Sequence, residues 1–188
     1  MLALTFDDGP DPVWTPRLLD LLGELGTRAT FFVIAPRAAA HPELIARMLD
    51  EGHSLGLHCE QHVRHSSREI AWGREDAARA TARLRELGGS PGLWRTPWGD
   101  LAWWSQQVAT EQNLRLVHWT VDTHDWRGDS TEQMFADTCD RLTHGAIVLA
   151  HDGIGPGARR TDAEQTLGFV ELAVAHARRH RLGLVALR

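Results

Sequence analysis

The chain has 188 residues, of which 43% are hydrophobic and 24% are charged, and its formal net charge is −5. This composition suits one folded domain over residues 1–188 and differs from that of a disordered chain. An acidic balance disfavours nucleic acid as the main partner, because phosphate binding requires clustered Lys and Arg. No run approaches the roughly 18–20 apolar residues of a membrane-spanning helix.

Met1 leads directly into an apolar run, without the basic segment and hydrophobic stretch of a signal peptide. The chain as given is therefore expected in the cytoplasm, although a secreted protein trimmed to its domain would look the same. Cys59 and Cys139 form no CxxC pair, so reduced thiols are favoured over a disulfide. The sequence does not indicate the oligomeric state.

Short apolar runs alternate with longer amphipathic ones along the whole chain. Strands are predicted over residues 2–6, 29–34, 53–57, 92–96, 114–122, 146–151 and 182–187. Helices are predicted over residues 15–25 (Thr15 as N-cap), 42–52, 76–87, 131–143 and 162–180. This alternation indicates an α/β fold in which about seven parallel strands form a barrel or an open sheet.

The first predicted strand ends in the acidic pair of LTFDDGP, Asp7 and Asp8. Turn chemistry alone can account for such a pair, whereas burial of both carboxylates requires a compensating cation. Ligands in α/β folds bind beyond the carboxyl ends of the strands, so other strand ends should also carry chemistry. They do, with His58, His62, Arg95, Asp122, Asp125 and His151.

His58 and His62 are four residues apart, which places both on one face of a helical turn. This spacing is weak evidence by itself, because surface His pairs occur without metal. Two His with one carboxylate from another strand end and an open position form a catalytic metal arrangement. A divalent cation would also compensate the acidic pair.

Five ordered motifs, TFDDGP, HxxxH, RTPWG, DTHDW and LAHD, span residues 5 to 152. In this order they resemble the motifs of the polysaccharide deacetylase family, also called the NodB homology domain or carbohydrate esterase family 4. The resemblance implies a distorted (β/α) barrel. It also implies a metal-dependent N-deacetylase that hydrolyses the acetamide of N-acetylated sugars, such as chito-oligosaccharide or peptidoglycan-type N-acetylglucosamine.

The resemblance assigns a metal-binding half of the site. Asp8, His58 and His62 are implied as ligands of one divalent ion, with Zn²⁺ favoured and Co²⁺, Ni²⁺ or Mn²⁺ as alternatives. Asp7 is implied as the general base that takes a proton from the attacking water. Arg95 resembles the arginine that holds this carboxylate.

The resemblance also assigns the half of the site that protonates the leaving amine and binds the acetyl group. His151 is implied as the general acid, and Asp125 as its carboxylate partner. Trp98 lies where a backbone amide helps to bind the developing oxyanion. Trp126 and Leu149 match the apolar positions that wall the acetyl pocket.

Some residues remain open. Cys59 replaces the Ser or Thr that usually follows the first His of the HxxxH motif, and a small buried replacement is favoured over a ligand or an oxidation site. Asp122 is either catalytic or braces its loop, and His65 is expected on the surface. Trp98, Trp103 and Trp104 could form a face for a sugar ring, but at least two of the three are expected in the core.

Two alternative functions also remain open. One is hydrolysis of a non-sugar N-acyl compound or a cyclic ureide by the same site. The other is a catalytically silent metal-binding or glycan-binding domain. Silent domains commonly lack the base, the acid or a ligand, and all of these are present here.

Overall fold

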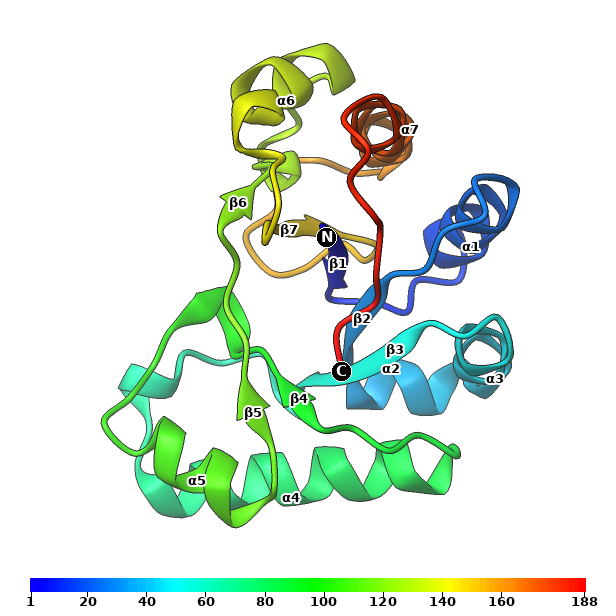
Figure 1. Cartoon of the computed structure of the whole chain (residues 1–188). Helices are drawn as coiled ribbons and strands as arrows, with labels where there is room; N and C mark the ends of the chain where they lie inside the picture. The colour runs from blue at the N-terminus through cyan, green and yellow to red at the C-terminus, as the bar shows by residue number, and fades with distance from the viewer.

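The computed structural model describes residues 1–188 and contains one sheet of seven parallel strands (Figure 1). The strands lie in the order β5-β4-β3-β2-β1-β7-β6. Their bounds are β1 (Ala3–Asp7), β2 (Thr30–Ile34), β3 (Ser54–Cys59), β4 (Leu93–Trp94), β5 (Arg115–Leu116), β6 (Val121–Asp122) and β7 (Ile147–His151). The prediction of an α/β fold with about seven parallel strands is confirmed.

The sheet curls into a half-barrel, and the chain itself bridges its open side. The outer strands β5 and β6 lie at opposite edges, yet only residues 117–120 separate them in the sequence. Each residue of an extended chain spans at most about 3.6 Å, so the two edges must approach within roughly 18 Å. The N–H of Val117 donates to Trp94 beside one edge, and the N–H of Thr120 donates to Ile147 beside the other.

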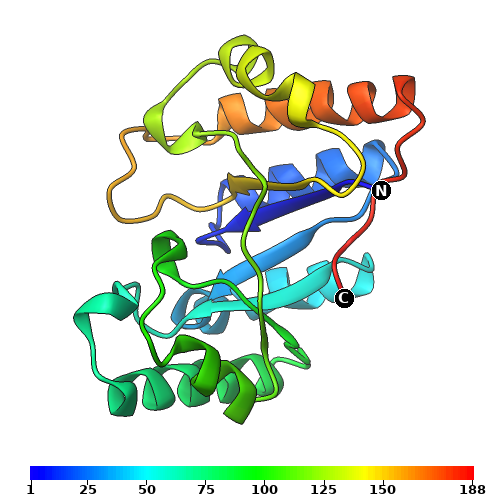
Figure 2. The ribbon, with the colours of Figure 1, turned by 60° about the vertical axis from the view of Figure 1, so that its left-hand side comes forward.

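Helices surround the curled sheet on its outer side (Figures 1 and 2). They are α1 (Trp14–Glu24), α2 (Ala35–Ala40), α3 (Pro42–Asp50), α4 (Ile70–Glu86), α5 (Ser105–Glu111), α6 (Thr131–Thr138) and α7 (Glu164–Arg179). The sequence did not predict the short helices α2 and α5. None of the helices is long and apolar enough to cross a lipid bilayer.

Two predicted helix starts were wrong. Thr15 is not an N-cap: the Asp11 carboxylate accepts from the N–H groups of Val13 and Trp14, while Thr15 lies inside α1 and donates to Asp152. Helix α4 begins at Ile70, six residues before the predicted start at Asp76.

The predicted strands 114–122 and 182–187 also differ from the structure. The first is interrupted, because it crosses the open side of the half-barrel and pairs with different strands at its two ends. The second is an extended segment with a single bridge, between Leu2 and Leu184. It lies across the end of the sheet opposite the carboxyl ends of the strands, where the N–H of Leu187 donates to Thr30.

Candidate active site

The carboxyl ends of the strands enclose a cavity of about 470 Å³. Eight of the ten predicted site residues line it: Asp7, Asp8, His58, His62, Trp98, Trp126, Leu149 and His151. The other two, Arg95 and Asp125, are buried. The structure therefore brings together side chains from the ends of β1, β3 and β7 and from the segments that follow β1, β3, β4 and β6.

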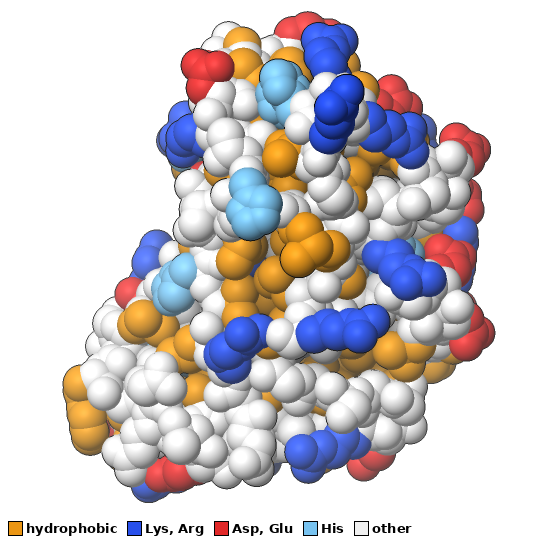
Figure 3. Space-filling view, in the orientation of Figure 1, with side chains coloured by type: hydrophobic (Ala, Val, Ile, Leu, Met, Phe, Trp, Pro, Cys, Tyr) orange, Lys and Arg blue, Asp and Glu red, His pale blue; other side chains and the backbone are white.

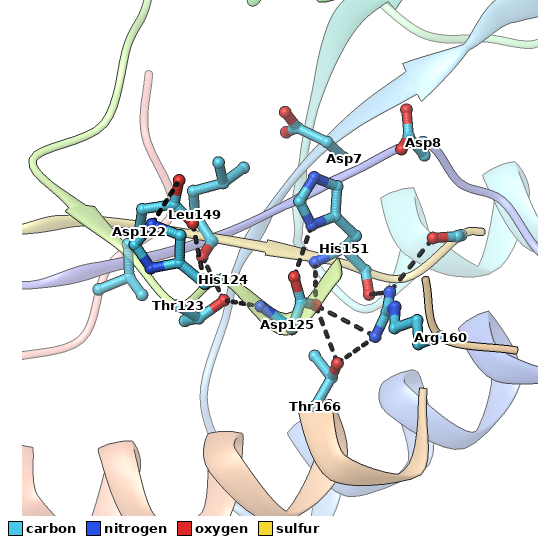
Figure 4. A network of polar contacts seen from close by, with 12 residues as sticks. Asp7, Asp8, Asp122, Thr123, His124, Asp125, Leu149, His151, Arg160 and Thr166 are labelled. Carbon is cyan, nitrogen blue, oxygen red and sulfur yellow. Dashed lines mark hydrogen bonds and ion pairs between the residues drawn. The ribbon is translucent and has the colours of Figure 1, made fainter. Parts of the chain in front are cut away.

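Asp8, His58 and His62 form a cluster that fits a metal ion. Their ligand atoms all lie within 4.8 Å of one another. The Asp8 Oδ1 atom is 3.3 Å from His58 Nε2 and 3.1 Å from His62 Nε2. Asp8 takes a left-handed conformation with φ of 73°, and its carboxylate points away from the neighbouring Asp7 carboxylate (Figure 4).

The hydrogen bonds around these residues leave lone pairs on His58 and Asp8 free to bind a cation. His58 Nδ1 lies 2.7 Å from the Arg95 carbonyl, which can only accept, so Nδ1 carries the proton and Nε2 presents a lone pair. Asp8 Oδ1 is buried without a hydrogen-bond partner. Two imidazole nitrogens and one carboxylate oxygen are a donor set typical of Zn²⁺ and similar divalent ions.

Charge in the cluster also favours a cation. Burial raises the pKa of Asp8, but the adjacent His58 and His62 imidazoles outweigh burial and hold it well below its ordinary value. Burial lowers the pKa of His58, but the Asp8 and Asp7 carboxylates outweigh burial and raise it. The site is therefore built to hold positive charge beside the ionised Asp8.

Asp7 is held by a buried arginine. Arg95 Nη1 donates to Asp7 Oδ1 at 2.8 Å and to Thr5 Oγ1 at 2.7 Å. The guanidinium also lies 4.2 Å from the centre of the Phe32 ring. These contacts hold the buried Asp7 carboxylate at the cavity wall beside a permanent positive charge.

The partly buried His151 and the buried Asp125 form a second pair. His151 Nδ1 lies 2.7 Å from Asp125 Oδ1, and the His151 backbone N–H donates to Asp125 Oδ2 at 2.9 Å (Figure 4). Burial lowers the pKa of His151, but Asp125 outweighs burial and raises it to about 9. Burial raises the pKa of Asp125, but the charge of His151 outweighs burial and lowers it to about 2.

The family model for polysaccharide deacetylases matches residues 1–117 of this chain. The chain belongs to the polysaccharide deacetylase family. It is thus a member of a family of hydrolases that act on carbon–nitrogen bonds other than peptide bonds.

Three comparisons describe the similarity. A chitooligosaccharide deacetylase of Bradyrhizobium sp. (strain ANU 289) is 38% identical over 168 residues, covering 87% of this chain and 75% of the relative. A peptidoglycan-N-acetylglucosamine deacetylase of Bacillus cereus is 34% identical over 155 residues, covering 82% of this chain. A crystal structure of a peptidoglycan N-acetylglucosamine deacetylase has a TM-score of 0.91 at 29% identity, covering 99% of this chain and 85% of that chain.

The length of the relatives varies. The alignment covers only 56% of the Bacillus cereus protein and 32% of a Listeria monocytogenes peptidoglycan deacetylase. This chain therefore spans about half the length of the first of these relatives and about a third of the second.

Two arginines that the sequence did not indicate also contact the site, Arg37 and Arg160. Arg37 of α2 donates to the Asp8 carbonyl at 2.8 Å and to the Ile154 carbonyl at 2.9 Å. Arg160 lies 3.1 Å from Asp125 Oδ2. Neither residue ends a strand or belongs to one of the five motifs, so only the folded structure reveals them.

The aromatic residues after β4 are more exposed than expected. Trp98 is 42% exposed and Trp103 is 78% exposed, so only Trp104 of the three lies in the core, and the expectation of at least two was wrong. Trp98 contacts the His62 ring edge-on, with 4.2 Å between ring centres, and the Arg64 guanidinium lies 4.7 Å from the Trp98 ring. An aromatic face therefore borders the cavity.

Three residues that the sequence left open have definite positions. Cys59 is a buried free thiol, and burial raises its pKa well above the ordinary value. His65 is buried, which corrects the expectation of a surface residue: its ring stacks on Trp104 and Nδ1 lies 3.1 Å from Ser105 Oγ. Asp122 lines the cavity and accepts from the His124 N–H at 2.8 Å, as a residue that braces its loop does.

Proposed function

We propose that this chain is a metal-dependent N-deacetylase that hydrolyses the acetamide of N-acetylglucosamine units in chito-oligosaccharides or peptidoglycan-type glycans. The observation that carries the proposal is that three functional groups line one cavity. They are the Asp8–His58–His62 cluster, Asp7 with its partner Arg95, and His151 with its partner Asp125. Relatives named for chitooligosaccharide and for peptidoglycan deacetylation support both substrate types.

Asp8, His58 and His62 are the residues that would hold the metal, and Zn²⁺ is the ion we propose. A bound divalent ion would act as a Lewis acid on the acetamide carbonyl and lower the pKa of a water molecule. Because the Nδ1–H of His58 is bound to a backbone carbonyl, its Nε2 is fixed as the donor atom.

The protein's own groups would move the protons. Asp7, held by Arg95, takes a proton from the water whose oxygen attacks the carbonyl carbon. The backbone N–H of Trp98 contributes to binding the oxyanion of the tetrahedral intermediate. His151 then protonates the amide nitrogen, the carbon–nitrogen bond breaks, and acetate and the free amine of the sugar leave.

The walls of the cavity suit the two parts of such a substrate. Trp126 and Leu149 supply apolar surface for the acetyl methyl group. Trp98 and Trp119 border the same cavity and offer aromatic faces for a pyranose ring. An acetyl group joined to a sugar ring therefore suits the walls of this cavity.

The testing experiment is acetate release from chitotetraose by the protein as purified, after chelation and after Zn²⁺ is restored. We expect release that stops on chelation and returns with Zn²⁺. A parallel assay on N-acetylated peptidoglycan fragments compares the two glycan types. Absence of acetate release from both by protein that contains one Zn²⁺ per chain would overturn the sugar substrate and favour another N-acyl compound.

A further inference from the structure

Arg160 completes a closed set of contacts around His151. Asp125 binds the His151 N–H and Nδ1, and Arg160 Nη2 donates to the His151 carbonyl at 2.7 Å. Arg160 Nη1 lies 3.1 Å from Asp125 Oδ2 and also contacts the Thr166 hydroxyl, which itself donates to that oxygen at 2.9 Å. Figure 4 shows these contacts converging from β7, the loop after it and the start of α7.

The consequence is that every polar atom of His151 except Nε2 has a protein partner. The backbone N–H and Nδ1 are bound by Asp125, and the backbone carbonyl is bound by Arg160. Nε2 is thus the one atom of His151 that remains for a substrate in the cavity. The direction of Nε2 depends on the position of the Asp125 carboxylate, which Arg160 and Thr166 fix from the opposite side.

We propose that Arg160 is a positioning residue for the acid step, acting through Asp125 to orient His151 and to keep the carboxylate paired after His151 has given up its proton. The proposal rests on the proposed deacetylase function. While His151 is protonated, Asp125 has two cationic partners; once the proton moves to the leaving nitrogen, Arg160 is the remaining one.

The burial of these side chains explains why a second cation is required. The Asp125 side chain is 1% exposed and that of Arg160 is 6% exposed. A buried carboxylate that loses its only cation is strongly disfavoured. Arg160 therefore lowers the cost of the proton transfer itself, in addition to holding the geometry before it.

The alternative is that Arg160 only clamps the glycine-rich loop, since it also donates to the Gly153 carbonyl at 3.2 Å. Arg37 provides a matched control for this role. It clamps the same loop through the Ile154 carbonyl and contacts the Asp8 carbonyl, but it makes no hydrogen bond or ion pair with Asp125 or His151. A comparison of the two arginines separates clamping of the loop from support of the acid.

The test is a pair of double-mutant cycles on chitotetraose, Arg160→Gln with His151→Ala and Arg37→Gln with His151→Ala. We expect Arg160→Gln to lower kcat about 10- to 100-fold with little change in KM, and to cause no further loss when His151 is already Ala. The effects of Arg37→Gln and His151→Ala should multiply. Arg160→Lys, which keeps the charge, should restore part of kcat.

Two results would overturn the proposal. One is a double variant in which the kcat losses of Arg160→Gln and His151→Ala multiply, and the other is an unchanged kcat in Arg160→Gln alone. Acetate release by the wild type tests the proposed function separately. Whatever its result, NMR can follow the His151 Nδ1–H proton, assigned by its loss in His151→Ala. Faster solvent exchange of this proton in Arg160→Gln and Arg160→Lys than in Arg37→Gln supports the proposal, and equal exchange in all of them contradicts it.

Discussion

The most direct residue-scale prediction concerns the two carboxylates at the end of β1. Asp7 and Asp8 are adjacent, but Arg95 binds one and two imidazoles face the other. Asp7→Asn should therefore lower the deacetylation rate about 10²–10⁴-fold, because it removes the base while the metal cluster stays intact. Metal content measured on the purified variant should remain near wild type. Rapid turnover by Asp7→Asn would show that another group acts as base.

Cys59 directly follows His58, a residue of the Asp8–His58–His62 cluster. Because the thiol is buried and its pKa is raised by burial, it stays protonated and is a poor ligand. Cys59→Ser should keep metal stoichiometry and change the deacetylation rate by less than about threefold. Loss of Zn²⁺ from this variant would make the thiol a ligand after all.

His151 gives a prediction for pH. Its pKa of about 9 lies above the ordinary value of 6.5, chiefly because of Asp125. The imidazolium is therefore present below about pH 9, and the stability of the pair, complete below the ordinary pKa, is lost as the pH rises through about 9. NMR titration of the chelator-treated protein should find this value, and Asp125→Asn should lower it. A bound cation near Asp8 should move it downwards, so the alkaline limb of the rate profile is expected below pH 9.

At the scale of elements, the loop after β7 must approach β1 closely. A Cβ added at Gly155 would lie 1.8 Å from Asp8 Oδ2, whereas a Cβ at Gly23 in α1 would meet nothing within 4 Å. Gly155→Ala should therefore displace Asp8 and weaken Zn²⁺ binding about 10- to 100-fold in a chelator competition. Gly23→Ala is the matched control: it should leave binding unchanged and raise the free energy of unfolding by about 0.5–1 kcal/mol. Equal Zn²⁺ affinity in both variants would contradict this reading of the loop.

The sequence predicts a strand and its terminal residues well where a short apolar run ends in polar residues. The bounds of β1, β2 and β7 follow from short apolar runs, and parallel pairing then gathers their terminal residues at one rim. His65 was misplaced because its burial depends on Trp94, Trp104 and Ser105, which lie about 30 to 40 residues away. Contacts between residues so far apart in the chain leave no pattern in the local sequence from which they could be predicted.

At the scale of the whole molecule, long-range charge pairing was the hardest feature to foresee. The partners of Asp7 and Asp125 include Arg95 and Arg160, which lie 88 and 35 residues from them along the chain. A motif indicated Arg95, but Arg160 stands in a loop without periodicity. The α/β pattern left a barrel or an open sheet possible, and only the family resemblance implied the curl. Which strands form the edges was not foreseen, because that depends on the crossing of residues 117–120 from one edge to the other.

The C-terminal segment closes the end of the half-barrel opposite the active site, and this separation gives a further test. The N–H of Leu2 donates to Gly183 at 2.8 Å, the N–H of Val185 donates to Leu2 at 3.0 Å, and the N–H of Leu187 donates to Thr30 at 2.8 Å. A chain ending at residue 181 loses all three bonds and exposes Leu2, which is buried.

At about 1 kcal/mol for each bond, and with the exposed apolar surface added, this truncation should lower the free energy of unfolding by about 3–5 kcal/mol. Urea unfolding measures the loss. Because the cavity lies at the carboxyl ends of the strands, Zn²⁺ affinity and kcat of the folded fraction should stay close to wild type at low temperature. A fall in kcat without a loss of stability would show that this segment acts on the active site rather than on the barrel.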